Sequence, residues 1–166
     1  MAGLGHLDVM GVKSIRDENL TWRMVQQALR YMDREMQDHY EQLKAQAKKG
    51  YIKLEENHLD YIEIHYLYTR SYFKDIETES DCREGFDYFM QQAKKYWLQN
   101  DIYMQGMMAL ALHRTGNGEI PAAIIRSLNE RALHSDEMGM TWKTDRGYFW
   151  YQAPIETQAL MVEVYD

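Results

Sequence analysis

The sequence predicts an all-α fold of antiparallel helical hairpins, with about six main helices in inner and outer layers. Apolar residues recur at steps of three and four along several long stretches, which is the spacing of one helix face. The 166-residue chain holds two prolines, and its glycines stand mainly between these stretches. Stretches with a charged face alternate with stretches that are apolar nearly all round. This alternation indicates half-exposed helices wrapped around buried ones.

The first elements are a helix end and a long amphipathic helix. Residues 3–12 have the pattern of a helix tail that Gly11 interrupts. A full helix is predicted over about 20–48, with Asp17 or Asn19 as its N-cap. Its apolar stripe is Val25, Ala28, Leu29, Met32, Met36, Tyr40, Leu43 and Ala47.

The second and third helices differ in how apolar they are. The second is predicted over 58–74 with Asn57 as its cap, and both of its faces should be covered because it is apolar nearly all round. The third begins at Thr78 or Ser80 and runs through Trp97 as an amphipathic helix. Its charged face is expected to meet solvent.

Short connections separate the fourth and fifth helices. A tight corner at 100–101 precedes the fourth helix, residues 102–112, which ends at a glycine-containing turn at 115–118. Pro121 fits the first turn of the fifth helix, whose apolar pattern continues to Leu133. Connections this short make neighbouring helices antiparallel.

A loop over about 135–152 leads to the sixth helix, which begins near Pro154 and shares a weak repeat with the fourth. Residues 102–108 (Ile-Tyr-Met-Gln-Gly-Met-Met) align with residues 155–161 (Ile-Glu-Thr-Gln-Ala-Leu-Met). In both, a small residue after the glutamine would let neighbouring inner helices approach closely. A repeated helical hairpin indicates an α/α solenoid or toroid, and chance similarity between two apolar helices is the alternative.

The length of the chain and the patterns at its two ends indicate how it is organised into domains. The chain is long enough for one helical domain over residues 1–166. It begins within a helical pattern, and nothing after Asp166 caps the last helix. We therefore expect a fragment of a much larger multidomain protein.

Charge and composition exclude several classes of partner. The net charge is −7 and there is no long basic run, so we expect no nucleic-acid partner. No apolar stretch is long enough to insert into a membrane, and the N-terminus lacks the pattern of a signal peptide. The single cysteine, Cys82, excludes an internal disulfide.

Candidate chemistry is sparse. The six histidines lack metal-ligand spacing; His58 and His65 share a helix face but lie two turns apart, so no metal or cofactor is predicted. Paired carboxylates would suit a glycosidase, although a solvated helix face is the favoured interpretation for this acidic group. The carboxylates concerned are Glu55, Glu56, Asp60 and Glu63.

An aromatic cluster precedes the sixth helix. It consists of Trp142, Tyr148, Phe149, Trp150 and Tyr151. Such a cluster could form a sugar platform or a cation cage. The favoured interpretation is a plug that seals the end of a helical layer, with interaction as its other role.

Several of these strings resemble the helical domain of bacterial alpha-2-macroglobulin-like proteins, particularly the large Bacteroidetes type. The resemblance is carried by Trp142 with residues 147–150 (Gly-Tyr-Phe-Trp) and by residues 153–160 (Ala-Pro-Ile-Glu-Thr-Gln-Ala-Leu). Residues 3–7 and 105–116 look like further segments of that domain. The resemblance covers essentially the whole chain.

The resemblance implies an incomplete α/α toroid, the fold shared with complement thioester domains and terpenoid cyclases. It implies a secreted, periplasmic or cell-envelope-anchored parent that is a broad-spectrum endopeptidase inhibitor and entraps proteases. The partners would be proteases and neighbouring domains of the same chain. No catalysis is expected.

Some family members form a thioester from Cys-Gly-Glu-Gln. The nearest string here is residues 82–85 (Cys-Arg-Glu-Gly), which lacks the glutamine that donates the acyl group. This segment is therefore not expected to form a thioester. Either the motif lies upstream in the parent, or the parent lacks it and would trap proteases by conformational change alone.

Two other functions remain open. A carbohydrate-active, glycosidase-like toroid would show two facing carboxylates in a groove and an exposed Trp142 or Trp150. A peptide-binding helical-repeat scaffold would show a concave, tyrosine-lined groove from the second, fourth and sixth helices. An incomplete ring would also expose inner-helix surface, through which the fragment could dimerise.

Overall fold

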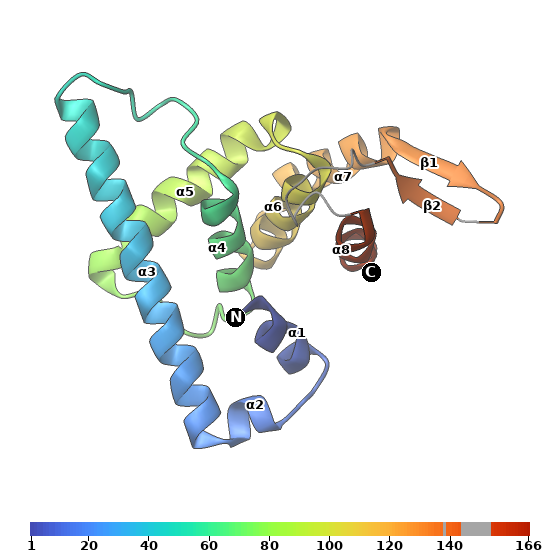
Figure 1. Cartoon of the computed structure of the whole chain (residues 1–166), viewed down its shortest axis with the longest axis horizontal. Coiled ribbons are helices and arrows are strands. Elements are labelled where there is room, and N and C mark those ends of the chain that lie inside the picture. The colour runs from blue at the N-terminus through green and yellow to red at the C-terminus, as the bar shows by residue number, and fades with distance from the viewer. Residues whose placement is uncertain (138, 144–153) are drawn as a thin grey trace. The chain divides into compact units, whose positions relative to one another are not determined.

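The computed structural model describes residues 1–137, 139–143 and 154–166 and confirms the all-α prediction (Figure 1). Helices hold 71% of these residues and strands 5%. The chain divides into two compact units, an N-terminal unit of Met1–Tyr96 and a C-terminal unit of Trp97–Asp166. The toroid and the single domain over 1–166 stay predictions. Across the described residues, no helix is both long and apolar enough to cross a membrane.

The N-terminal unit is built around the 30-residue helix α3. Its elements are α1 (Ala2–Val9), α2 (Ser14–Asp17), α3 (Asn19–Lys48), α4 (Tyr61–Ser71), the 3-10 helix η1 (Ser80–Cys82) and α5 (Arg83–Tyr96). α3 packs against α5 and α4, and the predicted stripe is its buried face. The side chains of Leu29, Ile64, Phe73 and Phe89 are fully buried in this core.

α5 comes close to the backbone of α3 at Gly85. A Cβ at this position would lie 2.9 Å from the Cα of Gln37, which is closer than two carbon atoms approach. The Gly85 N–H also donates to Oε1 of Gln37 over 2.7 Å. Glycine fits here because the two helices meet backbone to backbone.

Two predicted N-caps are wrong. α3 is preceded by Glu18 at the N-cap position, so neither Asp17 nor Asn19 caps it. α4 begins at Tyr61 rather than residue 58, and its cap is Asp60, which forms a capping box with Glu63.

Tertiary contacts explain the later start of α4. The backbone N–H of His58 donates to Gln92 on α5 over 3.1 Å, and the His58 ring bonds the carbonyl of Lys53. Asn57 caps only a local turn, in which its side chain accepts from the Leu59 N–H. His58 therefore lies outside the helix and does not share a face with His65, contrary to the prediction.

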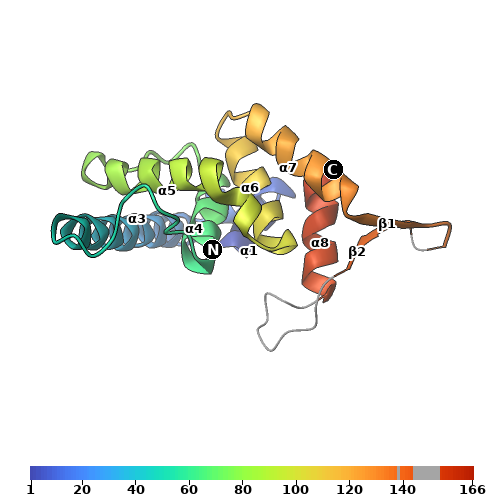
Figure 2. The same ribbon diagram turned by 90° about the horizontal axis from the view of Figure 1, so that it is seen from above.

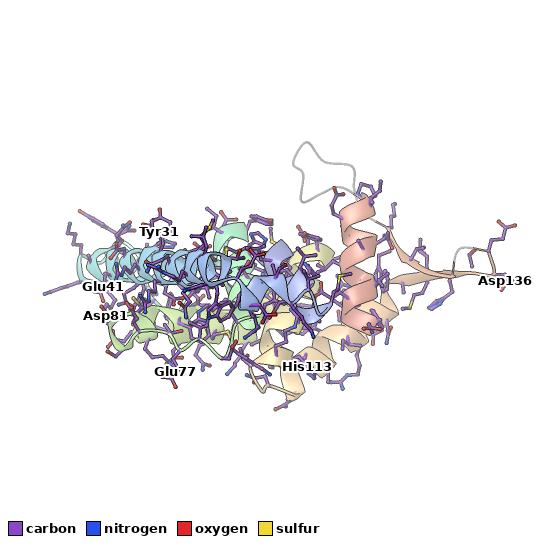
Figure 3. All side chains as sticks on the ribbon, turned by 90° about the horizontal axis from the view of Figure 1, so that it is seen from below. Tyr31, Glu41, Glu77, Asp81, His113 and Asp136 are labelled. Atoms are coloured by element: carbon purple, nitrogen blue, oxygen red, sulfur yellow. The ribbon has the colours of Figure 1, made fainter. Side chains whose placement is uncertain are left out.

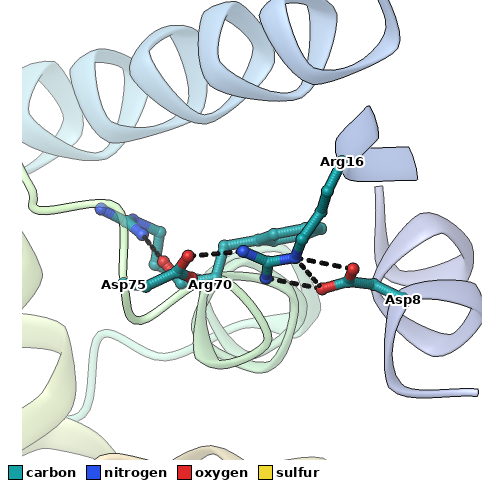
Figure 4. Close-up of polar contacts among 5 residues, drawn as sticks. Asp8, Arg16, Arg70 and Asp75 are labelled. Carbon is teal, nitrogen blue, oxygen red and sulfur yellow. Dashed lines mark hydrogen bonds and ion pairs between the residues drawn. The ribbon is translucent and has the colours of Figure 1, made fainter. Parts of the chain in front are cut away.

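α1 is held against the end of α4 by the backbone of Gly5, which packs closely on the side chain of Tyr72, and by polar side chains. Nε2 of His6 lies 2.7 Å from the hydroxyl of Tyr72 and 3.1 Å from that of Tyr68. Arg16 on α2 binds Asp8 through two nitrogens and Asp75 through a third (Figure 4). These bonds tie α1 and α2 to the segment that follows α4.

Gly5 should be the position in α1 least tolerant of a side chain. A Cβ at Gly5 would lie 2.5 Å from Cγ of Tyr72, whereas a Cβ at Gly3 meets nothing within 4 Å. We expect Gly5→Ala to destabilise the docking of α1 by about 1–3 kcal/mol through this clash. Hydrogen exchange of the α1 amides measures the effect as faster exchange.

Gly3→Ala is the matched control in the same helix. Alanine favours the helix by up to about 1 kcal/mol over glycine, so exchange in α1 should be unchanged or slower. Equal exchange in the two variants would show that α1 does not pack through Gly5.

The described part of the C-terminal unit contains three main helices and a hairpin. Its elements are η2 (Trp97–Gln99), α6 (Ile102–Arg114), α7 (Glu119–Glu130), β1 (Ala132–Ser135), β2 (Gly139–Trp142) and α8 (Pro154–Tyr165). α6 is buried continuously from Gln105 to Leu112 and packs against both α7 and α8. It is the central helix of this unit.

The predicted fifth helix is too long at its C-terminal end. α7 stops at Glu130, and β1 (Ala132–Ser135) pairs with β2 (Gly139–Trp142) in an antiparallel two-stranded ribbon, with Ala132 opposite Trp142. The ribbon extends beyond the end of α7 (Figures 1 and 2). Leu133 keeps helical spacing but is 56% exposed, so its apolar character did not indicate a buried helix face.

Candidate functional site

Trp142 is the member of the predicted aromatic cluster that the structure describes. It lies at the end of β2 with 6% of its surface exposed. Its indole N–H donates to the carbonyl of Leu128 on α7 over 2.9 Å. Its ring packs against Tyr165 of α8, with ring centroids 5.4 Å apart. Trp142 therefore joins the hairpin, α7 and α8.

Gln158 of α8 holds the backbone of Trp142 with both ends of its amide. Its Nε2 donates to the Trp142 carbonyl over 2.9 Å, and its Oε1 accepts from the Trp142 N–H over 3.3 Å. These two hydrogen bonds hold the end of β2 against the first half of α8. We name Trp142 and Gln158 with the Leu128 carbonyl the tryptophan clasp.

α8 also packs onto α6, through small and apolar residues. A Cβ at Gly106 would lie 2.8 Å from Cε of Met161 and 3.1 Å from Cδ2 of Leu160. Both of these side chains are buried, as is Thr157. Gly106 thus lies where α6 and α8 approach each other, as the repeat predicted, whereas Ala159, the small residue of the second copy, is exposed and does not lie at such an approach.

The two glutamines matched by the repeat both bind a non-helical connection. Gln105 donates to the carbonyl of Asn100 in the corner before α6 and accepts from Arg131 at the end of α7. Gln158 binds Trp142 at the end of β2. The repeat was the sequence signal for these residues, although it did not reveal their partners.

Further polar contacts connect α8 to α6 and α7 in the same unit. Arg114 at the end of α6 pairs with Glu163 of α8. The Tyr165 hydroxyl donates to Oδ1 of Asn129 over 2.8 Å. Tyr148, Phe149, Trp150 and Tyr151, the other predicted members of the cluster, lie outside the described residues.

The predicted acidic group serves the start of α4. The Glu63 carboxylate accepts from the Asp60 N–H over 2.8 Å and pairs with Nδ1 of His39 at 3.0 Å. Asp60 caps the helix, while Glu55 and Glu56 are exposed. Glu63 and Asp60 therefore have structural partners in place of the facing arrangement that a glycosidase needs.

Cys82 is a buried thiol in an acidic environment. Burial, followed by the nearby charge of Asp81, raises the pKa of Cys82 to about 11. The thiol is therefore protonated at neutral pH and is a poor nucleophile. Glu79 lies within 4.8 Å of Cys82 and Asp81 but pairs with Arg30 and Arg34, so positive charge already balances this cluster.

Comparison with protein-family models, curated proteins and solved structures finds no match to this chain.

Proposed function

We propose that this chain is part of the helical toroid domain of an alpha-2-macroglobulin-like protein that traps endopeptidases. Its role in such a parent is structural and interactive, in the periplasm or at the cell envelope. The observation that carries the proposal is the tryptophan clasp. Trp142 and Gln158, which belong to the strings that resemble this family, connect the hairpin to α7 and α8, and Leu160 of the same string packs on α6.

The tryptophan clasp supports the resemblance because two residues of the resembling strings bind each other. Trp142 and Gln158 are 16 positions apart, yet they form two hydrogen bonds with each other. Thr157 and Leu160, from the same string, are buried beside them on α8.

The packing of α6 on α8 supports the part of the resemblance that residues 105–116 carry. Helical rings require neighbouring inner helices to approach closely, and Gly106 lies at that approach in this unit. The buried run from Gln105 to Leu112 is what an inner helix requires on all of its faces.

The chemistry of Cys82 favours trapping without a covalent bond. A thioester needs a glutamine acyl donor close to the cysteine, and residues 82–85 provide Cys-Arg-Glu-Gly. Cys82 is buried, and its pKa is raised to about 11. Capture by conformational change alone is therefore the mechanism that we propose.

The carbohydrate alternative is less well supported. A sugar platform presents the face of an exposed aromatic ring, but Trp142 is buried and its N–H is bonded to a backbone carbonyl. We therefore interpret Trp142 as a packing residue.

Cleavage-induced compaction tests the proposal. The full-length gene product that contains this sequence, incubated with an active endopeptidase such as trypsin, should convert to a form that migrates faster on a native gel. Conformational trapping predicts this because cleavage of an exposed segment releases the closed state. The same protease with its active-site serine blocked is the control and should leave the mobility unchanged. Cleavage without any change in mobility would contradict the proposal.

A further inference from the structure

A pocket of about 320 Å³ opens between α3 and α4 in the N-terminal unit. Its wall from α3 includes Tyr31, Glu35 and Met36, and its wall from α4 includes Tyr61, His65 and Tyr66. The volume is at the lower end of the range for small-molecule sites. Figure 3 shows Tyr31 on the side of α3 away from Glu77 and the segment before α5.

Four of the eight residues that line the pocket carry a ring, namely Tyr31, Tyr61, His65 and Tyr66. The rings of Tyr61 and His65 stack, with centroids 5.4 Å apart and planes 24° from parallel. Tyr66 is buried, and its hydroxyl is engaged by Asp33 at 2.7 Å, so it offers the pocket its ring. Tyr31 is 64% exposed and stands at the rim.

The charge of the pocket is negative. Burial lowers the pKa of His65, so its ring is neutral at neutral pH. Glu35 then supplies the charge among the eight lining residues. The neighbouring cations of α3, Arg30 and Arg34, are paired with Glu79 before α5. An anionic ligand would therefore meet repulsion without a compensating cation in the wall.

We propose that this pocket binds an organic cation that carries a quaternary ammonium group. The faces of aromatic rings attract cations, and a quaternary ammonium has no N–H that needs a hydrogen-bond acceptor. Glu35 adds a carboxylate at the edge of the same pocket. A primary ammonium is more strongly hydrated and would lose more of its solvation against the tyrosine and methionine side chains.

This site is separate from the proposed protease trapping. Its residues all belong to the N-terminal unit, whereas the tryptophan clasp belongs to the C-terminal unit. Either proposal can fail without affecting the other.

Titration of the chain with choline and with 3,3-dimethylbutan-1-ol, its neutral isostere, tests the inference by calorimetry or NMR. Choline should bind saturably, and the isostere should bind at least about fivefold more weakly because it lacks the positive charge. Equal binding of both compounds, or no saturable binding of choline, would overturn the proposal.

Two exposed residues provide variants that should fold normally. Glu35→Gln and Tyr31→Ala should each raise the dissociation constant for choline by about two- to fivefold. Glu41→Gln, on the same helix but outside the pocket, removes the same charge and should leave the constant unchanged. If Glu41→Gln weakens binding as much as Glu35→Gln, the attraction comes from net charge and the pocket is not the site.

Vesicles distinguish the source of the cation. If the chain binds phosphatidylcholine vesicles and free choline displaces it, the cation is a lipid headgroup. If it binds choline but not these vesicles, the ligand is a free small molecule. Both results support the proposed chemistry, whereas binding to vesicles that choline does not displace contradicts it.

Discussion

Replacing Asp33 by alanine should lower the free energy of unfolding of the N-terminal unit by about 3–5 kcal/mol. Asp33 and Arg70 are 2% and 3% exposed, and Nε of Arg70 donates to Oδ1 of Asp33 over 3.1 Å. The same oxygen accepts from the Tyr66 hydroxyl. Removing Asp33 leaves a buried guanidinium without its counter-ion, which is strongly unfavourable in a poorly solvated core. Urea unfolding, with hydrogen exchange to localise the loss, measures the effect.

Two further variants show whether the buried charge is the cause. The exposed pair of Arg83 and Asp87 provides the control, because Asp87→Ala should change stability by less than about 0.5 kcal/mol. The double variant Asp33→Leu with Arg70→Met should be markedly more stable than Asp33→Ala, since it removes both charges together. An Asp33→Ala variant as stable as the Asp87→Ala variant would show that the pair is not buried in solution.

Replacing Trp142 by alanine should have the largest effect in the C-terminal unit, a loss of about 3–5 kcal/mol. The variant loses the packing on Tyr165 and the bond to the Leu128 carbonyl, and it leaves a cavity between the hairpin, α7 and α8. We expect faster hydrogen exchange throughout α6, α7 and α8. Exchange in α3 and α5 reports on the other unit and serves as an internal reference.

The variant Trp142→Phe separates the contribution of packing from that of hydrogen bonding, and a surface variant on α8 is the control. Trp142→Phe keeps a ring but removes the indole N–H, while the Leu128 carbonyl still accepts from the Arg131 N–H, so it should cost about 0.5–1.5 kcal/mol. Ile155→Ala, at a position on α8 that is 81% exposed, should stay within about 0.5 kcal/mol of the parent sequence. If Trp142→Ala is no more destabilising than Ile155→Ala, the tryptophan clasp does not hold this unit together.

Periodicity predicted the long helices well because their signals are local and repeated. The helix expected over 20–48 is α3 (Asn19–Lys48), and the glycine turns after α3 and α6 lie where they were expected. These elements need no distant partner to be recognised. Their apolar residues recur over many turns, and Gly50 and Gly116 take the positive φ that ends each helix.

The wrong boundaries lie where tertiary contacts decide between equally suitable residues. Asn57 and Asp60 are both good cap residues, and the bond from His58 to Gln92 on another helix excludes the earlier start. At the end of α7, Leu133 continued the helical spacing. The hairpin forms there because Trp142, ten residues after Ala132, is held by α7 and α8.

The residues of the tryptophan clasp and of the buried ion pair were predicted only in part. Trp142 was predicted as a member of the aromatic cluster before the sixth helix, and the repeat drew attention to Gln158, but neither signal showed that the two residues bind each other. The buried Asp33 was missed, although the spacing contained a clue. Asp33 lies four residues after Leu29 and three before Met36, on the stripe that the prediction assigned to the core.

The most direct test of the proposed function compares two substrates of a protease held by the full-length gene product. A trapped protease keeps an open active site inside a cage, so it should retain most of its activity on a small chromogenic peptide. Its activity on a large protein substrate such as casein should fall in proportion to the amount trapped. Activity retained on both substrates, or lost on both, would contradict entrapment.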